Sequence, residues 1–160
     1  MRIILSGICG YMGREVMKLA KKGLRGSEVV FGVDINADGP IDGIPTSKSF
    51  DTVCANADCI IDFSHHSCTK ALCDFAVANN LPLILATTGQ TPEENEMIRE
   101  ASAKIPLFRA ANFSLGVALL IELAKRAASA MPEAEIEIVE THHDRKLDAP
   151  SGTALAIANR

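Results

Sequence analysis

Two stretches of the 160-residue chain combine residue types that can do chemistry. The first is a glycine cluster after an apolar run, Gly7-Ile8-Cys9-Gly10-Tyr11-Met12-Gly13. Glycines between a strand and a helix permit a tight turn and close approach to a pyrophosphate, which the helix N-terminus then binds. Cys9 occupies the usual second glycine position of the dinucleotide-binding pattern. Taken alone, the cluster also fits an ordinary tight strand-to-helix turn.

Asp34 favours the dinucleotide interpretation. It ends the next apolar run and follows Gly13 by about 20 residues, which is where an acidic side chain holds the ribose hydroxyls of NAD. Ile35 comes directly after it, so no adjacent arginine can receive a 2′-phosphate. The pattern therefore favours NADH over NADPH.

The second stretch runs from Glu140 to Ala154. His142, His143 and Lys146 follow a predicted strand, and Ser151-Gly152-Thr153 opens a predicted helix. Cations beside the free amides of a helix N-terminus form an anion site suited to carboxylates. Histidine moves protons near neutral pH, and lysine can donate a proton or hold a carboxylate. The alternative interpretation is a charged surface loop.

Strands and helices alternate between these two stretches, which predicts βαβ units on a parallel sheet. The predicted strands are Arg2–Ser6, Glu28–Asp34, Asp58–Phe63, Pro82–Thr87 and Pro106–Arg109. The predicted helices are Tyr11–Lys22 with Met12, Val16 and Leu19 as its buried face, Ser67–Asn80, and one capped by Thr91. Pro40 and Pro45 indicate an irregular loop over Ile35–Lys48. The expected fold is α/β, a Rossmann-like doubly wound sheet whose strand tips, including Thr87-Thr88-Gly89 and Ala111–Ser114, line a ligand crevice.

The pattern changes after Asn112. A long amphipathic helix over Ser114–Met131 precedes alternating polar and apolar residues over Glu135–Thr141, which predict a half-buried strand. We therefore expect a dinucleotide-binding domain over 1–112 and the start of an α+β substrate-binding and oligomerisation domain over 113–160. The last strand finds no later strand in this sequence, so we expect a shortened form of a longer protein in which NADH binding can survive.

Composition excludes several classes of function. The 20 acidic and 16 basic side chains give a net charge of −4, which attracts neither nucleic acid nor an anionic membrane. No apolar run reaches the length of a membrane span. Five cysteines, an odd number, come without a secretory segment, so we expect a reducing, cytoplasmic location.

Neither a metal site nor a cysteine nucleophile is expected. His65, His66, Cys68 and Cys73 stand close together, but they form no C-x-x-C pair and the two cysteines do not share a helical face. Cys9 has no histidine near it in the pattern to act as its base, although a thiol in the glycine turn could make the cofactor site sensitive to thiol reagents.

The motifs together resemble the dihydrodipicolinate reductase (4-hydroxy-tetrahydrodipicolinate reductase) family of lysine biosynthesis. They are spread from residue 7 to residue 154 in the order of the family. The matching segments are Gly7-x-x-Gly10-x-Met12-Gly13-Arg14, Asp62-Phe63-Ser64, Thr87-Thr88-Gly89, Ala111-Asn112-Phe113-Ser114-x-Gly116 and Glu140-Thr141-His142-His143-x-x-Lys146-x-Asp148-Ala149-Pro150-Ser151-Gly152-Thr153-Ala154.

The resemblance implies a homotetramer that reduces a cyclic dicarboxylate with NADH or NADPH. His142 would be the acid/base residue and Lys146 the proton donor, while His143, Gly152 and Thr153 would bind a substrate carboxylate. The implied cofactor-binding residues are Gly7, Ile8, Cys9, Gly10, Tyr11, Met12, Asp34, Ala86, Thr87, Thr88, Ala110, Ala111, Asn112 and Phe113.

Three alternatives stay open at this point. A non-catalytic dinucleotide-binding module would keep the glycine turn and Asp34, but it has no need of the segment from His142 to Thr153. A different dehydrogenase on the same fold is disfavoured by the same segment. An inactive truncated fragment of the reductase is the third alternative.

Overall fold

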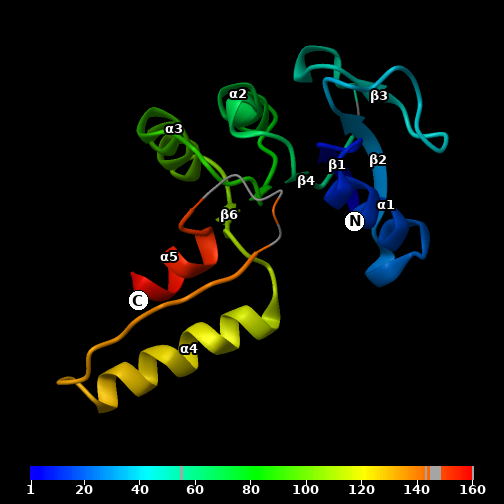
Figure 1. Ribbon diagram of the computed structural model, residues 1–160. Coiled ribbons are helices and arrows are strands. Elements are labelled where there is room, and N and C mark those ends of the chain that lie inside the picture. Colours follow the sequence, from blue (N-terminus) through cyan, green and yellow to red (C-terminus); the bar gives the residue numbers. More distant parts are fainter. Residues whose placement is uncertain (55, 143, 145–148, 160) are drawn as a thin grey trace. The chain divides into compact units, whose positions relative to one another are not determined.

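The computed structural model describes residues 1–54, 56–142, 144 and 149–159. The chain forms two units, Met1–Arg109 and Ala110–Arg160, which are described separately below. Figure 1 shows the strands in the first unit and the long helix α4 (Leu115–Ala130) in the second.

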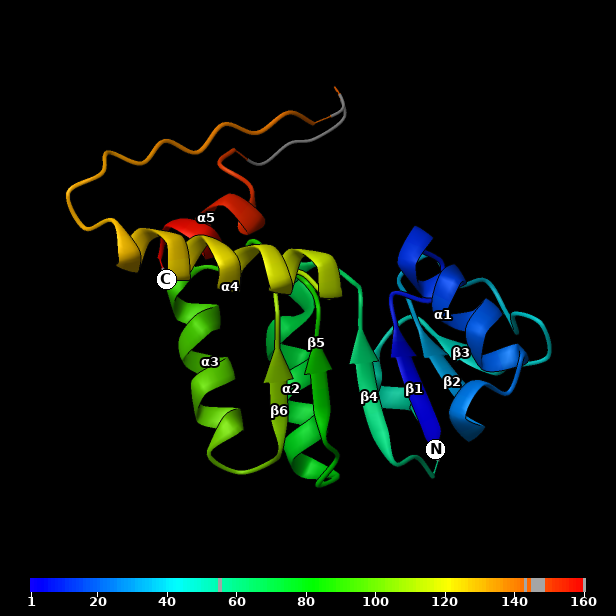
Figure 2. The same cartoon turned by 90° about the horizontal axis from the view of Figure 1, so that it is seen from below.

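The first unit is built on a six-stranded, all-parallel sheet with the order β3-β2-β1-β4-β5-β6. Its strands are β1 (Arg2–Ser6), β2 (Glu28–Val33), β3 (Thr46–Ser47), β4 (Cys59–Asp62), β5 (Leu83–Leu85) and β6 (Leu107–Arg109). Figure 2 shows them side by side. The order reverses between β1 and β4, and such a switch point is where open α/β sheets bind ligands. The predicted doubly wound fold is confirmed.

The helices cover both faces of the sheet because the central strands are apolar on both sides. On one face, Ile4 and Ile60, both 0% exposed, join a core cluster with Leu72 of α2 (Thr69–Ala78) and Ile98 of α3 (Pro92–Ser102). The opposite face packs against Met17 of α1 (Tyr11–Lys21). The helical elements are α1 (Tyr11–Lys21), η1 (Leu24–Gly26), η2 (Phe50–Thr52), η3 (His66–Cys68), α2 (Thr69–Ala78) and α3 (Pro92–Ser102).

Helix α3 begins where its sequence predicts. The Thr91 hydroxyl accepts a hydrogen bond from the Glu94 amide at 3.2 Å, and the Glu94 carboxylate accepts one from the Thr91 amide at 2.8 Å. This capping box satisfies two amides that a helix start otherwise leaves without partners, and Pro92 occupies the first helical position.

Two local predictions in the first unit are wrong. Met12 and Leu19 are 45% and 48% exposed, because α1 packs through Gly13 and Met17 instead. The same helical spacing runs through both sets, and a glycine that allows close backbone approach carries no hydrophobic signal.

The predicted irregular loop over Ile35–Lys48 contains the short strand β3. The Pro45 carbonyl accepts a hydrogen bond from the Gly32 amide at 3.0 Å. Proline lacks only the donor, so it can precede an edge strand without interrupting the sheet.

In the second unit, Ser114 caps α4 (Leu115–Ala130) through its hydroxyl, and α5 (Gly152–Ala158) follows Ser151. The predicted strand over Glu135–Thr141 is wrong, because this segment is exposed and forms no strand in the described chain. An apolar face alone does not make a strand, which needs a hydrogen-bonding neighbour. No helix among the described residues is long and apolar enough to cross a membrane.

Candidate active site

The glycine turn lies at the carboxyl end of β1, and its shape depends on missing side chains. A Cβ atom on Gly7 would lie 2.5 Å from the Phe63 carbonyl oxygen, and one on Gly13 would lie 2.2 Å from the Gly7 carbonyl oxygen. Gly7 also has a positive φ of 80°. Gly10 caps α1 without a side-chain hydrogen bond, so no side chain of the cap covers the first-turn amides. This arrangement fits the pyrophosphate of a dinucleotide.

Asp34 follows β2 and holds the turn directly. Its Oδ2 accepts a hydrogen bond from the Cys9 amide at 3.0 Å, and its Oδ1 accepts one from the Asn36 amide at 2.9 Å. A carboxylate oxygen has more than one acceptor site, so both oxygens keep capacity for ribose hydroxyls. Burial, and then the neighbouring Asp34 carboxylate, raise the pKa of the Cys9 thiol, which disfavours the nucleophilic thiolate.

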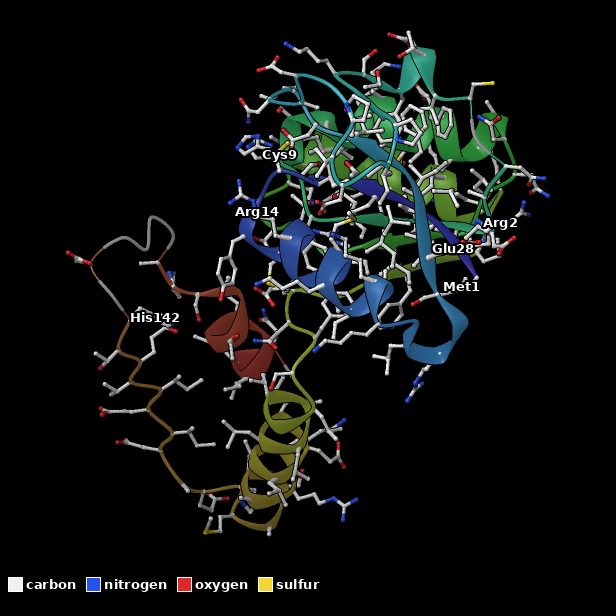
Figure 3. The ribbon with its side chains drawn as sticks, turned by 90° about the vertical axis from the view of Figure 1, so that its right-hand side faces the viewer. Met1, Arg2, Cys9, Arg14, Glu28 and His142 are labelled. Atoms are coloured by element: carbon white, nitrogen blue, oxygen red, sulfur yellow. The ribbon has the colours of Figure 1, made fainter. Side chains whose placement is uncertain are left out.

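Two hollows follow the carboxyl ends of the strands. The larger, about 510 Å³, extends from Gly7 and Gly10 past Asp34 to His65. The smaller, about 290 Å³, lies between residues 63–65 after β4 and residues 86–88 after β5. Figure 3 shows Cys9 and Arg14 at this end of β1, opposite Met1 and Arg2. The first hollow suits the adenosine half of a dinucleotide and the second its other half.

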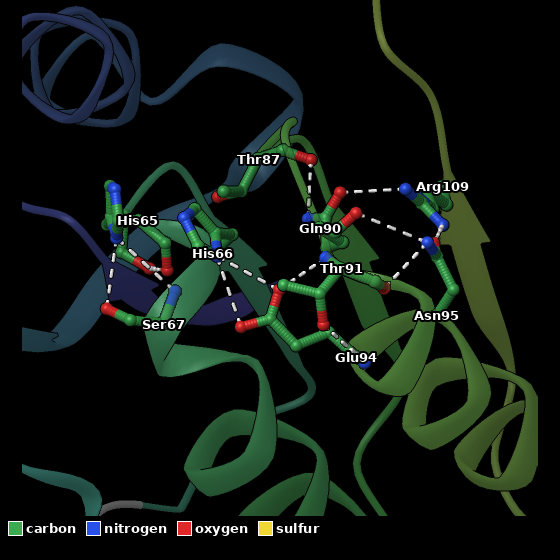
Figure 4. A network of polar contacts seen from close by, with 10 residues as sticks. His65, His66, Ser67, Thr87, Gln90, Thr91, Glu94, Asn95 and Arg109 are labelled. Atoms are coloured by element: carbon green, nitrogen blue, oxygen red, sulfur yellow. Dashed lines mark hydrogen bonds and ion pairs between the residues drawn. The ribbon is translucent and has the colours of Figure 1, made fainter.

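A polar network of side chains reaches Thr87, which lines the smaller hollow (Figure 4). Arg109 at the end of β6 donates to the side-chain oxygens of Asn95 at 2.5 Å and Gln90 at 2.7 Å. Gln90 in turn donates to the Thr87 carbonyl at 2.9 Å. His66 lies 2.9 Å from the Glu94 carboxylate through its Nδ1 atom. The network therefore links the loop after β5 to α3, β6 and η3.

The hydrogen bond from Thr91 and the contact with His66 hold the pKa of Glu94 below its usual value. Burial raises the pKa of Cys73 to about 11, which disfavours the thiolate that zinc requires. Among the described residues, no group of three or more His, Cys, Asp or Glu side chains is arranged to hold a metal ion.

In the second unit, Glu140 connects the histidine segment to the start of α5. Its carboxylate accepts hydrogen bonds from the Ser151 amide, at 2.7 Å, and from the Ser151 hydroxyl. The Nδ1 atom of His142 lies 3.7 Å from the same carboxylate. Asn112 donates to the Thr153 hydroxyl at 3.1 Å, which joins a predicted cofactor residue to a predicted substrate residue. His143 and Lys146 lie outside the described residues.

Most predicted cofactor residues of the first unit gather around the two hollows. The Ile8 side chain is buried in the core beneath α1, so its backbone alone is available to a cofactor. Tyr11 and Met12 are exposed at the start of α1. Four further predicted residues belong to the second unit: Ala110, Ala111, Asn112 and Phe113.

Sequence reasoning assigned no role to Asp62, His65, Gln90 or Glu140. Asp62 ends an apolar run, as Asp34 does, and that position was the available signal. Glu140 stands within the motif that carries the resemblance. The sequence raised His65 only as a possible metal ligand, and Gln90 gave no signal, because only the fold brings their loops beside the hollows.

Known proteins match nearly the whole length of the chain. The family profile described as dihydrodipicolinate reductase, N-terminus, matches residues 1–113, and the C-terminus profile matches residues 116–160. The 4-hydroxy-tetrahydrodipicolinate reductase of Caldanaerobacter subterraneus subsp. tengcongensis is 47% identical over 158 residues, which cover 99% of this chain and 62% of that protein. That of Clostridium perfringens is 39% identical, with the same coverage. The chain thus spans about 62% of the length of these curated relatives.

Solved structures agree. A dipicolinate-bound dihydrodipicolinate reductase from Paenisporosarcina sp. TG-14 has a TM-score of 0.77 at 26% identity, with 99% of this chain and 64% of that chain covered. An oxidoreductase from Agrobacterium radiobacter in complex with NAD+ has a TM-score of 0.56 at 20% identity over 84% of this chain and 42% of that chain, a likeness of fold alone. With both family profiles matched and the predicted sheet present, the chain belongs to the dihydrodipicolinate reductase family.

Proposed function

We propose that this chain carries the dinucleotide site and part of the substrate site of an NAD(P)H-dependent reductase for 4-hydroxy-tetrahydrodipicolinate. The observation that carries the proposal is the glycine turn tied to Asp34 at the switch point of the sheet. Family membership supports the substrate, a cyclic dicarboxylate of lysine biosynthesis.

The residues of the first unit would bind and orient the cofactor. The amides at the start of α1 would bind the pyrophosphate, and Asp34 would accept hydrogen bonds from the adenosine ribose. The residues around Thr87 and Thr88 would flank the nicotinamide end. When bound, the dinucleotide supplies the hydride that reduces the substrate ring.

The residues of the second unit would handle the proton and the carboxylates. His142 is the proposed acid/base residue, and its Nδ1 atom lies 3.7 Å from the Glu140 carboxylate. Lys146 would donate the proton that balances the hydride. His143 with Gly152 and Thr153 would hold a substrate carboxylate, so the reacting carbon stays beside the cofactor.

Cofactor preference, assembly and location follow from the same proposal. Asp34 is followed by Ile35, which favours NADH because a 2′-phosphate would meet the Asp34 charge without an adjacent arginine. We also propose a homo-oligomer, which is a tetramer in the family, and a cytoplasmic location. The five free cysteines support the reducing compartment.

The decisive experiment measures NADH binding and NADH oxidation in parallel, with freshly made substrate and with 2,6-pyridinedicarboxylate as a product-like inhibitor. His142→Ala should lower turnover by roughly two to four powers of ten while NADH binding stays unchanged. Val139→Ala, an exposed position nearby, is the matched control. Near-normal turnover in His142→Ala would remove the proton-transfer role. NADH binding without any oxidation would favour the non-catalytic module or the inactive fragment.

A further inference from the structure

Asp62, the last residue of β4, is a buried carboxylate to which the proposed reaction gives no role. It is 1% exposed. Its Oδ1 accepts hydrogen bonds from the Ser64 hydroxyl at 2.6 Å and the Ser64 amide at 3.3 Å, and its Oδ2 accepts one from the Thr87 hydroxyl at 2.5 Å. Removing a carboxylate from water is unfavourable unless several donors surround it. The cluster of Asp62, Ser64 and Thr87, called here the Asp62 clasp, supplies those donors.

The clasp joins two strands just beyond the point where their backbones stop pairing. The register of β4 and β5 ends at Asp62 and Leu85, and one more bond runs from the Ala86 amide to the Asp62 carbonyl at 3.0 Å. Beyond that bond the described residues form no further backbone hydrogen bonds between β4 and β5, and the bond from the Thr87 hydroxyl to the Asp62 side chain holds the two segments together instead. The two segments joined in this way, 63–65 and 86–88, line the smaller hollow.

The same contacts reach the glycine turn. The Phe63 amide donates to the Ser6 carbonyl at 2.9 Å, and the Phe63 carbonyl oxygen occupies the space that a Cβ atom on Gly7 would need. The position of residues 63 and 64 therefore sets the clearance above the turn. The Asp62 carboxylate thus links the carboxyl ends of β4 and β5, and the backbone of Phe63 links that of β4 to β1.

We infer that Asp62 is a positioning residue that fixes the width of the hollow for the nicotinamide end of the cofactor. The inference rests on the proposed dinucleotide site. It also changes the role of Thr87, whose hydroxyl is turned inward and is bound by Asp62, leaving the residue 8% exposed. Thr87 acts through Asp62, whereas Thr88 is exposed at the hollow.

The test compares two ligands that fill different parts of the site. NADH binding, measured by fluorescence, depends on both hollows, whereas ADP binding, measured by calorimetry, depends on the larger one. Thr87→Val keeps the shape of the side chain and removes the hydroxyl. We expect it to weaken NADH binding by ~10-fold, since even a small displacement of the residues that position a ligand is costly. ADP affinity should change by less than about twofold, because the segment that Thr87→Val releases, residues 86–88, lines the smaller hollow only. Residues 63–65 line both hollows, but they keep the bonds from Ser64 to Asp62 and from the Phe63 amide to Ser6.

Two further variants keep the test decisive. Thr87→Ser restores the hydroxyl and should return NADH affinity to within about twofold of the parent, which a simple packing role would not do. Asp62→Asn replaces one of the two accepting carboxylate oxygens by an amide group that donates. It should weaken NADH binding at least as much as Thr87→Val does. If Asp62→Asn does not fold, the valine and serine variants carry the test.

Thr46→Val is the matched control, because it removes a threonine hydroxyl bond to the Gly39 carbonyl, at 2.7 Å, on strand β3. An unchanged ratio of NADH to ADP affinity in folded Thr87→Val would overturn the inference. This holds both if the two affinities are unchanged and if they fall by the same factor. A parent chain that binds neither ligand would overturn the proposed function itself, and the inference with it.

Discussion

The two units of the chain are stabilised to very different degrees. The first unit encloses its strands between helices, and residues such as Ile60 and Leu85 are completely buried. In the second, α4 has no buried residue, and Leu115 is 85% exposed. Burial of apolar surface is the main source of folding free energy. Cofactor binding is therefore expected to depend on a stable scaffold, while the proposed chemistry would depend on residues in the more exposed unit.

The largest contrast should come from removing an apolar side chain in each unit. Ile60→Ala leaves a cavity in the sheet core and should cost ~3 kcal/mol of unfolding free energy. Leu123→Ala on α4, exposed in this chain, should change the unfolding free energy by less than about 0.5 kcal/mol. Urea unfolding followed by circular dichroism measures both. A Leu123→Ala effect as large as that of Ile60→Ala would break the comparison.

Glycine positions give the next contrast. Gly13→Ala places a Cβ atom 2.2 Å from the Gly7 carbonyl oxygen, so we expect a loss of ~2 kcal/mol together with weaker NADH binding. Gly116→Ala on α4 meets nothing nearer than the Ser114 hydroxyl, at 3.6 Å. It should stabilise α4 by ~1 kcal/mol, because alanine is the better helix former. Circular dichroism measures the helicity, and NADH titration measures cofactor affinity. Equal losses of stability in Gly13→Ala and Gly116→Ala would contradict the close packing assigned to Gly13.

Removing a helix cap in each unit should give a smaller difference in stability between the two units. Thr91→Ala removes the capping box of α3 and should lower the unfolding free energy of the first unit by ~1 kcal/mol. Ser114→Ala should fray α4 and leave the unfolding midpoint of the first unit in place. Residue-resolved hydrogen exchange distinguishes the two units, and protection lost in α3 after Ser114→Ala would count against their independence.

The smallest effect is a dependence on pH. The Arg2 amide and guanidinium hold the pKa of Asp58 below its ordinary 3.8, and the Thr91 amide, followed by His66, holds that of Glu94 below 4.5. Both carboxylates contribute stability at neutral pH that is lost as the pH falls below about 4.5. Urea midpoints at pH 7, 5 and 3 should show this loss. Glu94→Gln should flatten the profile, and an unchanged profile would exclude this contribution.

The sheet was predictable because buried parallel strands form apolar runs bounded by glycine or proline. Arg2–Ser6 was predicted with the bounds that β1 shows. The Glu135–Thr141 prediction failed for the opposite reason, because alternation reports an apolar face and says nothing about a hydrogen-bonding neighbour. The glycine turn and Asp34 were identifiable from their spacing. The Asp62 clasp was not, because Thr87 lies 25 residues away and only the sheet order brings it to Asp62.

The central position of β1 also has a kinetic consequence. Its neighbours are β2 and β4, and the Arg2 amide reaches the Asp58 carboxylate across 56 residues. Long-range pairing of this kind costs the conformational entropy of closing a loop before the strands can form stabilising contacts. Parallel sheets therefore fold slowly compared with helical bundles. During synthesis, the first strand must wait for β4 to leave the ribosome before the crevice can form. Until then the edge of β1 that pairs with β4 has no partner strand, and unpaired strand edges of this kind favour aggregation.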